Sequence, residues 1–195
     1  MALKLKLVVP PEIEPVTLQE ANAHIVEENQ DSLIRVSELI VAAREYCERF
    51  QERQYITATW ELWLDSWPSR EYISIPRPPL QTVLSVKYFG SDGKEHVMKE
   101  TDYITDPISE PGRIVLNHNK SWPSCALRPV NGIAIRFVAG YGDSPSDVPR
   151  VARQAILMLI GHWHDNREAT TIGVVAREMP FSVNSLLWPE RVMPV

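Results

Sequence analysis

The stretch of residues 31–65 reads DSLIRVSELIVAAREYCERFQERQYITATWELWLD, and its hydrophobic period changes part-way along. In the first part the apolar residues are three or four positions apart, as on one face of an α-helix: Leu33, Val36, Ile40, Ala43, Cys47 and Phe50. In the second part they alternate with other residues, as in a half-buried strand: Ile56, Ala58, Trp60, Leu62 and Leu64. We therefore expect a helix over residues 31–53, followed directly by a strand.

Two more helices are expected on either side of this stretch. Thr17 and Glu20 have the spacing of a capping box, which predicts a short helix over residues 17–29. Ser146 or Asp147 can cap a third helix over residues 148–166, with Pro149 in its first turn. This third helix is apolar on more than one face, so we expect it to be covered both by its own core and by a neighbouring subunit.

Between the second and third helices the chain has the short alternating segments and turn residues of strands. The segments expected as strands after the first one are residues 72–75, 83–89, 95–98, 113–116 and 133–138. Residues 117–130 read as a polar loop that contains proline, and residues 1–9 read as a short strand or extended arm.

These patterns predict an α+β protein with a helical body and a β-rich module inserted between its second and third main helices. We expect residues 1–195 to form a single domain, since 195 residues suffice to bury one sizeable core. Residues 17–53 and 148–168 form the helical body, residues 56–141 the β-rich insertion, and residues 169–195 a C-terminal docking tail.

The charge and cysteine content exclude several classes of protein. The chain has 20 Lys and Arg against 25 Asp and Glu, a net charge of -5, with no basic run, which disfavours a protein that grips nucleic acid. The two cysteines, Cys47 and Cys125, fit free thiols in a reducing compartment. Lysines interrupt the apolar N-terminus, so we expect no signal peptide, and no apolar run is long enough to span a membrane.

The most metal-like cluster is His162 and His164 with Glu168. Residues two apart on a helix point about 200° away from each other, so the two histidines cannot share an ion. His164 and Glu168 could, but two ligands are too few for a zinc site. The sequence also lacks the G-x-S-x-G motif of many hydrolases. We therefore predict no catalytic, cofactor-binding or metal-binding residues, and keep a small metal-dependent or hydrolytic enzyme as the alternative.

Tryptophans and the apolar tail point instead to contacts with other proteins. Trp60 and Trp63 face opposite sides of one strand, so both sides are expected to contact apolar groups. The segment from Phe181 to Val195 is apolar but too short to pack alone, which predicts that it docks on another protein. The residues predicted to contact neighbouring subunits or partners are Arg44, Arg153, Trp163, Arg167, Phe181, Leu186, Leu187 and Trp188.

Taken in order, several short motifs resemble those of tailed-phage head–tail connector (adaptor) proteins. They are Leu18 to His24, Asp31 to Tyr46, Trp67-Pro68, Pro78 to Tyr88, Asp92-Gly93, Phe137 to Gly142, Val148-Pro149, Ala155 to Leu157 and His162 to Glu168. The resemblance spans about residues 17 to 190 and is to the long form with a β-rich insertion, found in prophages and gene transfer agents. His164 departs from the aromatic residue expected within the last motif.

The resemblance implies a structural protein of the virion neck that catalyses no reaction and uses no cofactor. Such proteins form a ring, implied to be dodecameric, on the portal vertex after DNA packaging, and they assemble in the host cytoplasm. The ring joins the portal protein to a stopper or tail-completion protein and surrounds the channel through which DNA passes without sequence-specific binding. Another tail or capsid accessory protein with the same layout is a further alternative.

Overall fold

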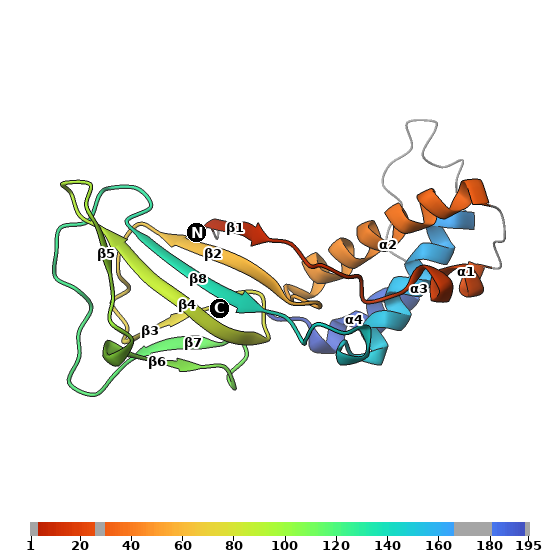
Figure 1. The fold of residues 1–195 in the computed structure, drawn as a ribbon. Helices are drawn as coiled ribbons and strands as arrows, with labels where there is room; N and C mark the ends of the chain where they lie inside the picture. Colours follow the sequence, from red (N-terminus) through yellow and green to blue (C-terminus); the bar gives the residue numbers. More distant parts are fainter. Residues whose placement is uncertain (1–3, 26–29, 166–180, 194–195) are drawn as a thin grey trace. The chain divides into compact units, whose positions relative to one another are not determined.

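The computed structural model describes residues 4–25, 30–165 and 181–193. The chain folds into two compact units, each made from two separate segments (Figure 1). The β unit consists of residues 1–11 and 57–141, and the helical unit of residues 12–56 and 142–195. The predicted α+β class is confirmed, since helices and antiparallel sheets occupy different parts of the chain.

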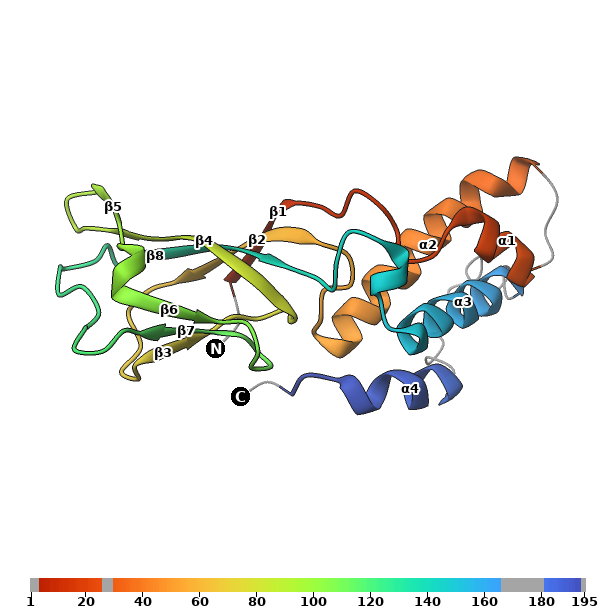
Figure 2. The same cartoon turned by 60° about the horizontal axis from the view of Figure 1, so that its bottom comes forward.

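The β unit contains two antiparallel sheets, which lie in two layers (Figure 2). The five-stranded sheet has the order β1 (Lys4–Val9), β2 (Ala58–Leu64), β8 (Ile133–Ala139), β4 (Leu80–Phe89) and β5 (Glu95–Val97). The three-stranded sheet has the order β3 (Tyr72–Ser74), β7 (Arg113–Leu116) and β6 (Tyr103–Asp106). Each predicted strand segment overlaps an observed strand, and β1 shows that the N-terminal segment is an edge strand of the larger sheet.

One strand, β6, was not predicted. Its four residues, Tyr103 to Asp106, include two polar side chains, and only Tyr103 is buried. A strand with a single residue in the core leaves no period-two pattern to detect. Its place is fixed by pairing with β7 along Tyr103↔Leu116 to Asp106↔Arg113.

The core of the β unit takes side chains from both sheets. Leu62, Ile135 and Val86 are opposite one another on β2, β8 and β4, and all three are fully buried. Ile73 and Ile114 form a second buried cross-strand pair, in the smaller sheet, and belong to the same cluster. This packing explains why the sequence between the main helices alternates: one residue in two must enter the space between the layers.

The helical unit contains α1 (Leu18–Ile25), α2 (Gln30–Gln51), α3 (Arg150–Asp165), α4 (Phe181–Leu187) and the 3-10 turn η4 (Trp188–Glu190). The three predicted helices are therefore present. The capping box before α1 is confirmed, since the Glu20 amide donates to Thr17 Oγ1 at 3.1 Å and the Thr17 amide donates to a Glu20 oxygen at 2.9 Å. The predicted stripe on α2 is buried at Val36, Ile40, Ala43 and Cys47.

The start of the third helix differs from the prediction. Ser144, rather than Ser146 or Asp147, is the cap, and it precedes a 3-10 turn, η2 (Pro145–Asp147), instead of α3 itself. Asp147 completes the capping box by accepting from the Ser144 amide at 3.0 Å. The two residues after this turn, Val148 and Pro149, are not helical, so α3 begins at Arg150.

The C-terminal tail also differs from the prediction. The expectation that the apolar segment after residue 180 has no partner within the chain is wrong for Val183 and Leu187. Both are fully buried on the inner side of α4, which packs against α3 and α2. A seven-residue helix with two buried residues is stable only because neighbouring helices cover it.

Cys47 and Cys125 are both free, as predicted. Burial raises the pKa of the Cys47 thiol to about 12, with a smaller contribution from the Glu48 carboxylate, whereas Cys125 is exposed. None of the helices in the described ranges is long and apolar enough to cross a membrane.

Replacing Phe137, which is fully buried on the central strand β8, should lower the free energy of unfolding of the β unit. We expect Phe137→Ala to cost about 3–5 kcal/mol, because it removes a ring and leaves a cavity. The matched control Ile104→Ala, on the exposed side of β6, should change it by less than about 0.5 kcal/mol. Urea unfolding followed by tryptophan fluorescence measures both, and equal costs would contradict the assignment of the core.

Candidate functional site: the end of α2 and the C-terminal helix

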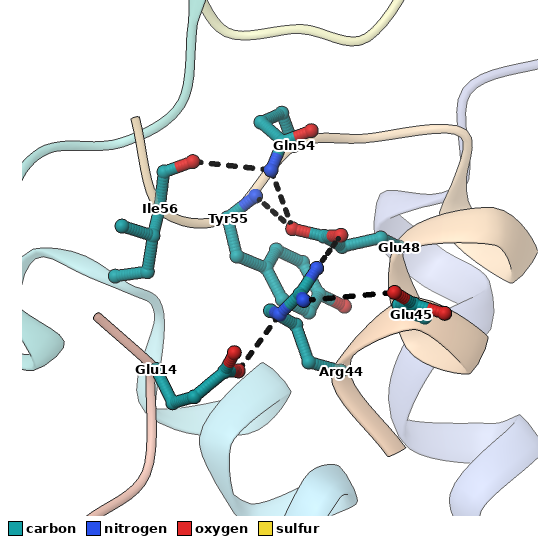
Figure 3. Close-up of polar contacts among 7 residues, drawn as sticks. All are labelled: Glu14, Arg44, Glu45, Glu48, Gln54, Tyr55 and Ile56. Carbon is teal, nitrogen blue, oxygen red and sulfur yellow. Dashed lines mark hydrogen bonds and ion pairs between the residues drawn. The ribbon is translucent and has the colours of Figure 1, made fainter. Parts of the chain in front are cut away.

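A buried carboxylate, that of Glu48, lies near the C-terminal end of α2 and accepts from three donors (Figure 3). One oxygen accepts from Arg44 Nη1 at 2.8 Å. The other accepts from Gln54 Nε2 at 2.8 Å and from the Tyr55 amide at 2.9 Å. These bonds join the last turns of α2 to the chain that leaves the helix, so Glu48 fixes the exit of residues 54–56.

Arg44 is the cation of this cluster and is itself buried. Its Nε donates to Glu14 at 2.7 Å, and its Nη2 lies 3.8 Å from Glu45. Burial opposes its charge, but the carboxylates of Glu48 and Glu14 outweigh that effect and raise the pKa of Arg44 above its ordinary value. The guanidinium therefore ties α2 to the segment that precedes α1.

The same end of α2 holds the tail through main-chain groups. Gln51 Nε2 donates to the Leu187 carbonyl at 2.7 Å, and the Gln51 carbonyl accepts from the Val192 amide at 3.0 Å. Arg53 Nε donates to the Glu190 carbonyl at 2.6 Å. The Tyr55 hydroxyl donates to Gln51 Oε1 at 2.6 Å and so fixes the Gln51 amide. Polar bonds at one helix end thus hold the backbone of residues 187–192.

Fixing the backbone of the tail leaves part of its apolar surface in solvent. Phe181 is 86% exposed and Met193 is 63% exposed, while Trp188 is also exposed. The Trp188 ring lies 6.4 Å from that of Phe50, and the Arg191 guanidinium lies over both rings at 5.3 and 5.1 Å. The tail therefore presents positioned apolar side chains on its outer side.

The predicted interface residues fall into three groups. Arg44 and Leu187 are buried within the chain, and Leu186 is half-buried. Arg153 bonds the Pro15 carbonyl at 2.9 Å and pairs with Glu20, and the Trp163 ring packs edge-on against Tyr46 at 6.1 Å. Phe181 and Trp188 are exposed, and Arg167 lies outside the described residues. Their roles between subunits stay predictions. Phe181 and Trp188 have the most solvent-exposed surface available for such a contact.

The tryptophans of the β unit mainly contact other rings of the same unit. Trp60 packs on the core, whereas Trp63 stacks on Phe89 at 6.0 Å on the other side of the sheet, as the alternation predicted. Trp122 stacks on Trp67 with 4.9 Å between ring centroids. The packing of Trp122 in a loop is thus explained within the chain.

The alternative metal site is not assembled in the part of the chain that the structure describes. His162 and His164 are on the last turns of α3, and Glu168 lies outside the described residues. No group of three or more His, Cys, Asp or Glu side chains that could hold an ion exists among the described residues.

Sequence reasoning missed the polar residues that build the site. Glu48, Gln51 and Gln54 read as the solvent side of an amphipathic helix and its exit, yet all three are buried. The only local signal is that glutamine, arginine and glutamic acid crowd the helix end immediately before an apolar strand. Gln51 and its neighbours Arg44 and Arg53 bond residues 187, 14 and 190, which are too far away in the sequence for a periodicity to reveal them.

Comparison with solved structures identifies the fold. The chain superposes on a protein of the neck of an empty gene transfer agent particle, whose structure was computed with C6 symmetry, with a TM-score of 0.78, 21% identity and coverage of 98% of this chain and 96% of the other. A chain from the virion of a native gene transfer agent particle gives 0.78, 22%, 98% and 97%. A chain from the native neck, computed with C12 symmetry, gives 0.73, 23%, 100% and 97%.

This is the fold of a gene transfer agent neck protein. The resemblance predicted from the sequence is thereby confirmed at the level of the fold, and over almost the whole length of both chains. No protein-family model matches the sequence, and no curated protein matches it either. The sequence searches and the structural superposition are compatible. Only about one residue in five is identical between this chain and the neck proteins, although their backbones superpose.

The role of Glu48 can be tested by Glu48→Gln. This change replaces one of the two carboxylates that bond the buried Arg44 with an amide, which should lower the free energy of unfolding by about 3–5 kcal/mol. Glu45→Gln is the matched control, because Glu45 is exposed and 3.8 Å from the same arginine, and it should cost less than about 1 kcal/mol. Urea unfolding by far-UV circular dichroism gives both values, and a small loss for Glu48→Gln would refute the role.

Proposed function

We propose that this protein is a structural head–tail connector (adaptor) of a tailed phage, prophage or gene transfer agent. The observation that carries the proposal is the superposition on neck proteins over at least 96% of either chain. The protein would therefore work in the neck of the particle and be assembled in the host cytoplasm.

The connector would act as a ring. The solved necks were computed with C6 and C12 symmetry, which supports a ring of copies around the particle axis and fits a dodecamer. One heterologous interface repeated by rotation closes such a ring. We propose that the ring sits on the portal protein, carries a stopper or tail-completion protein, and surrounds the DNA exit channel. The net charge of -5 suits a wall that does not hold passing phosphates.

Within this proposal the chain works as one adaptor domain, from residue 1 to residue 195. Its helical body is formed by the three main helices, and its β-rich module is the insertion between the second and third of them. The tail after residue 168 is the docking segment. The intrachain bonds of residues 187–192 support this role, because a segment whose backbone is already ordered loses less entropy when its exposed side chains bind.

The rival function, a small metal-dependent or hydrolytic enzyme, has less support. It depends on His162, His164 and Glu168, and the two histidines are two positions apart on one helix. The neck proteins that share the fold are structural components of their particles. Another alternative is a different tail or capsid accessory role. The stage at which particle assembly stops when the protein is absent distinguishes that role from the connector role.

Removing the protein should stop assembly between head and tail. In cells that produce the particle, deletion of its gene should leave DNA-filled or leaking heads and separate, complete tails in negative-stain images, and expression of the wild-type chain should restore joined particles. Joined particles in the absence of the protein would exclude the connector function. Empty heads without a DNA-filled stage would point instead to a role in the capsid or in packaging.

The docking role of the tail can be tested without unfolding α4. Phe181→Asp with Met193→Asp places charge on two exposed apolar residues and leaves the buried Val183 and Leu187 unchanged. We expect at least about a tenfold loss of joined particles, because truncating the central apolar residues of an interface costs about 2 kcal/mol or more. The matched control is Ile108→Asp with Val130→Asp, two exposed apolar residues of the β unit. Equal yields from both double variants would remove the tail from the interface.

A further inference from the structure

The two units carry opposite charge. The β unit has eleven Lys and Arg against nine Asp and Glu, a formal charge of +2, and the helical unit has nine against sixteen, a formal charge of -7. All the lysines of the chain are in the β unit: Lys4, Lys6, Lys87, Lys94, Lys99 and Lys120. The two units therefore have opposite net charges. Opposite charges favour a contact between the β unit of one copy and the helical unit of another.

The five-stranded sheet has one side that the smaller sheet does not cover. Residues opposite one another in neighbouring strands share a side of the sheet, and so do residues two apart along a strand. One cross-strand row on this uncovered side contains Lys4, Trp63, Ala134, Lys87 and Val97, and the next row contains Lys6, Glu61, Arg136 and Ser85. We call these two rows, with the adjoining Asp65, Phe89, Glu95 and Arg128, the open face.

Ion pairs on the open face leave an excess of positive charge. Lys4 pairs with Asp65 at 2.7 Å, Lys87 with Glu95 at 2.8 Å, and Arg136 with Glu61 at 2.7 Å. Lys6 is exposed and makes no ion pair with another described residue. Arg128 lies 4.0 Å from the Phe89 ring centroid and donates to the Asn131 carbonyl, and it too makes no ion pair with another described residue. The open face thus carries five cations and three carboxylates.

The helical unit has an exposed surface with the opposite character. On α2, Ile34, Glu38, Val41 and Glu45 follow one another at spacings of four, three and four, so they form one stripe along the helix. Ile34 is 73% exposed and Val41 is 38% exposed. Glu38 makes no ion pair with another described residue, and Glu45 has only the distant Arg44 at 3.8 Å. Several other carboxylates of this unit already have partners within the chain. Glu20 and Asp147 belong to capping boxes, and Glu14 and Glu48 bond Arg44.

We propose that the open face of one copy binds the α2 stripe of the next copy. This inference rests on the proposed ring, and it identifies the two different surfaces that a heterologous contact needs. Lys6, Lys87 and Arg136 would meet Glu38 and Glu45, while Trp63 and Val97 would meet Ile34 and Val41. Duplex DNA is a weaker fit for the open face, because only two of its cations lack a carboxylate and several are needed to hold phosphates.

A charge-exchange experiment tests the contact in the full-length chain. The sheet variant is Lys6→Glu with Lys87→Glu, and the helix variant is Glu38→Lys with Glu45→Lys. Both positions of each pair are on the surface, and the Arg136–Glu61 pair is left intact. Each variant alone should self-associate at least about tenfold more weakly than wild type, because like charges then face each other. An equimolar mixture should regain association to within about threefold, since every contact in an alternating assembly again pairs opposite charges.

Native mass spectrometry and sedimentation velocity over a concentration series measure this association. The matched control is Arg70→Glu with Lys120→Glu, which makes the same change in net charge beside the three-stranded sheet and should associate like wild type. Far-UV circular dichroism verifies that each variant is folded. A loss in the control equal to that in the sheet variant, or a mixture no better than its components, overturns the proposal.

Disulfide trapping gives a second readout for a chain that is monomeric in isolation. In a Cys125→Ser background, Lys6→Cys with Val41→Cys should give a ladder of linked oligomers on a non-reducing gel, whereas Ile104→Cys with Val41→Cys should give none. Absence of the ladder overturns the proposal. The connector function is tested by a different result: it is refuted if particles that lack the protein still join heads to tails. Duplex DNA binding by wild type that the sheet variant loses, without recovery in the mixture, assigns the open face to nucleic acid and refutes the contact between copies.

Discussion

The helical unit depends on a single buried carboxylate. Glu48 accepts from Arg44, Gln54 and the Tyr55 amide, and together with Glu14 it compensates the charge of the buried Arg44 guanidinium. Burial of an ion pair is favourable only when its remaining hydrogen-bonding capacity is satisfied, and here both oxygens are used. Because the same helix end also holds the tail through Gln51 and Arg53, one electrostatic arrangement fixes the chain before α1, the exit of α2 and the backbone around η4.

That arrangement explains how the tail can be ordered and still keep apolar side chains in solvent. Two residues of α4, Val183 and Leu187, are buried in the chain, while Phe181 and Met193 remain in solvent. The buried residues and the main-chain bonds hold the segment in place, so that its exposed side chains have a defined position. In the β unit a similar division holds across one sheet, where Leu62 and Ile135 face the core and the ion pair of Glu61 and Arg136 is on the other side. Alternation along a strand is enough to give the sheet one apolar side toward the core and one charged side.

The sequence predicted most of the elements and the fold shared with the neck proteins, but particular elements were missed or placed differently. The helix of residues 31–53, the strands at residues 113–116 and 133–138, and the capping box at Thr17 all follow from local patterns that the structure confirms. The strand β6 has one buried residue and left no pattern, and the cap at Ser144 was placed too late because a 3-10 turn intervenes. The tail was expected to lack a partner in the chain, since no periodicity in seven residues reveals that two of them meet α2 and α3.

The sequence by itself determined the kind of each main element, the separation of charge between its parts and the order of motifs that resembles connectors. These depend on neighbours three, four or two positions away, or on composition alone, and a linear pattern records them. Only the tertiary structure decided that Glu48 and Gln51 are inside, that Lys6, Glu61 and Arg136 form one row, and that Leu187 is covered while Trp188 is not. The row across the sheet and the contacts of Gln51 and Leu187 join residues that are tens of positions or more apart. The free energy of burying a polar group such as Glu48 depends on its hydrogen-bond partners, which a hydrophobic period does not specify.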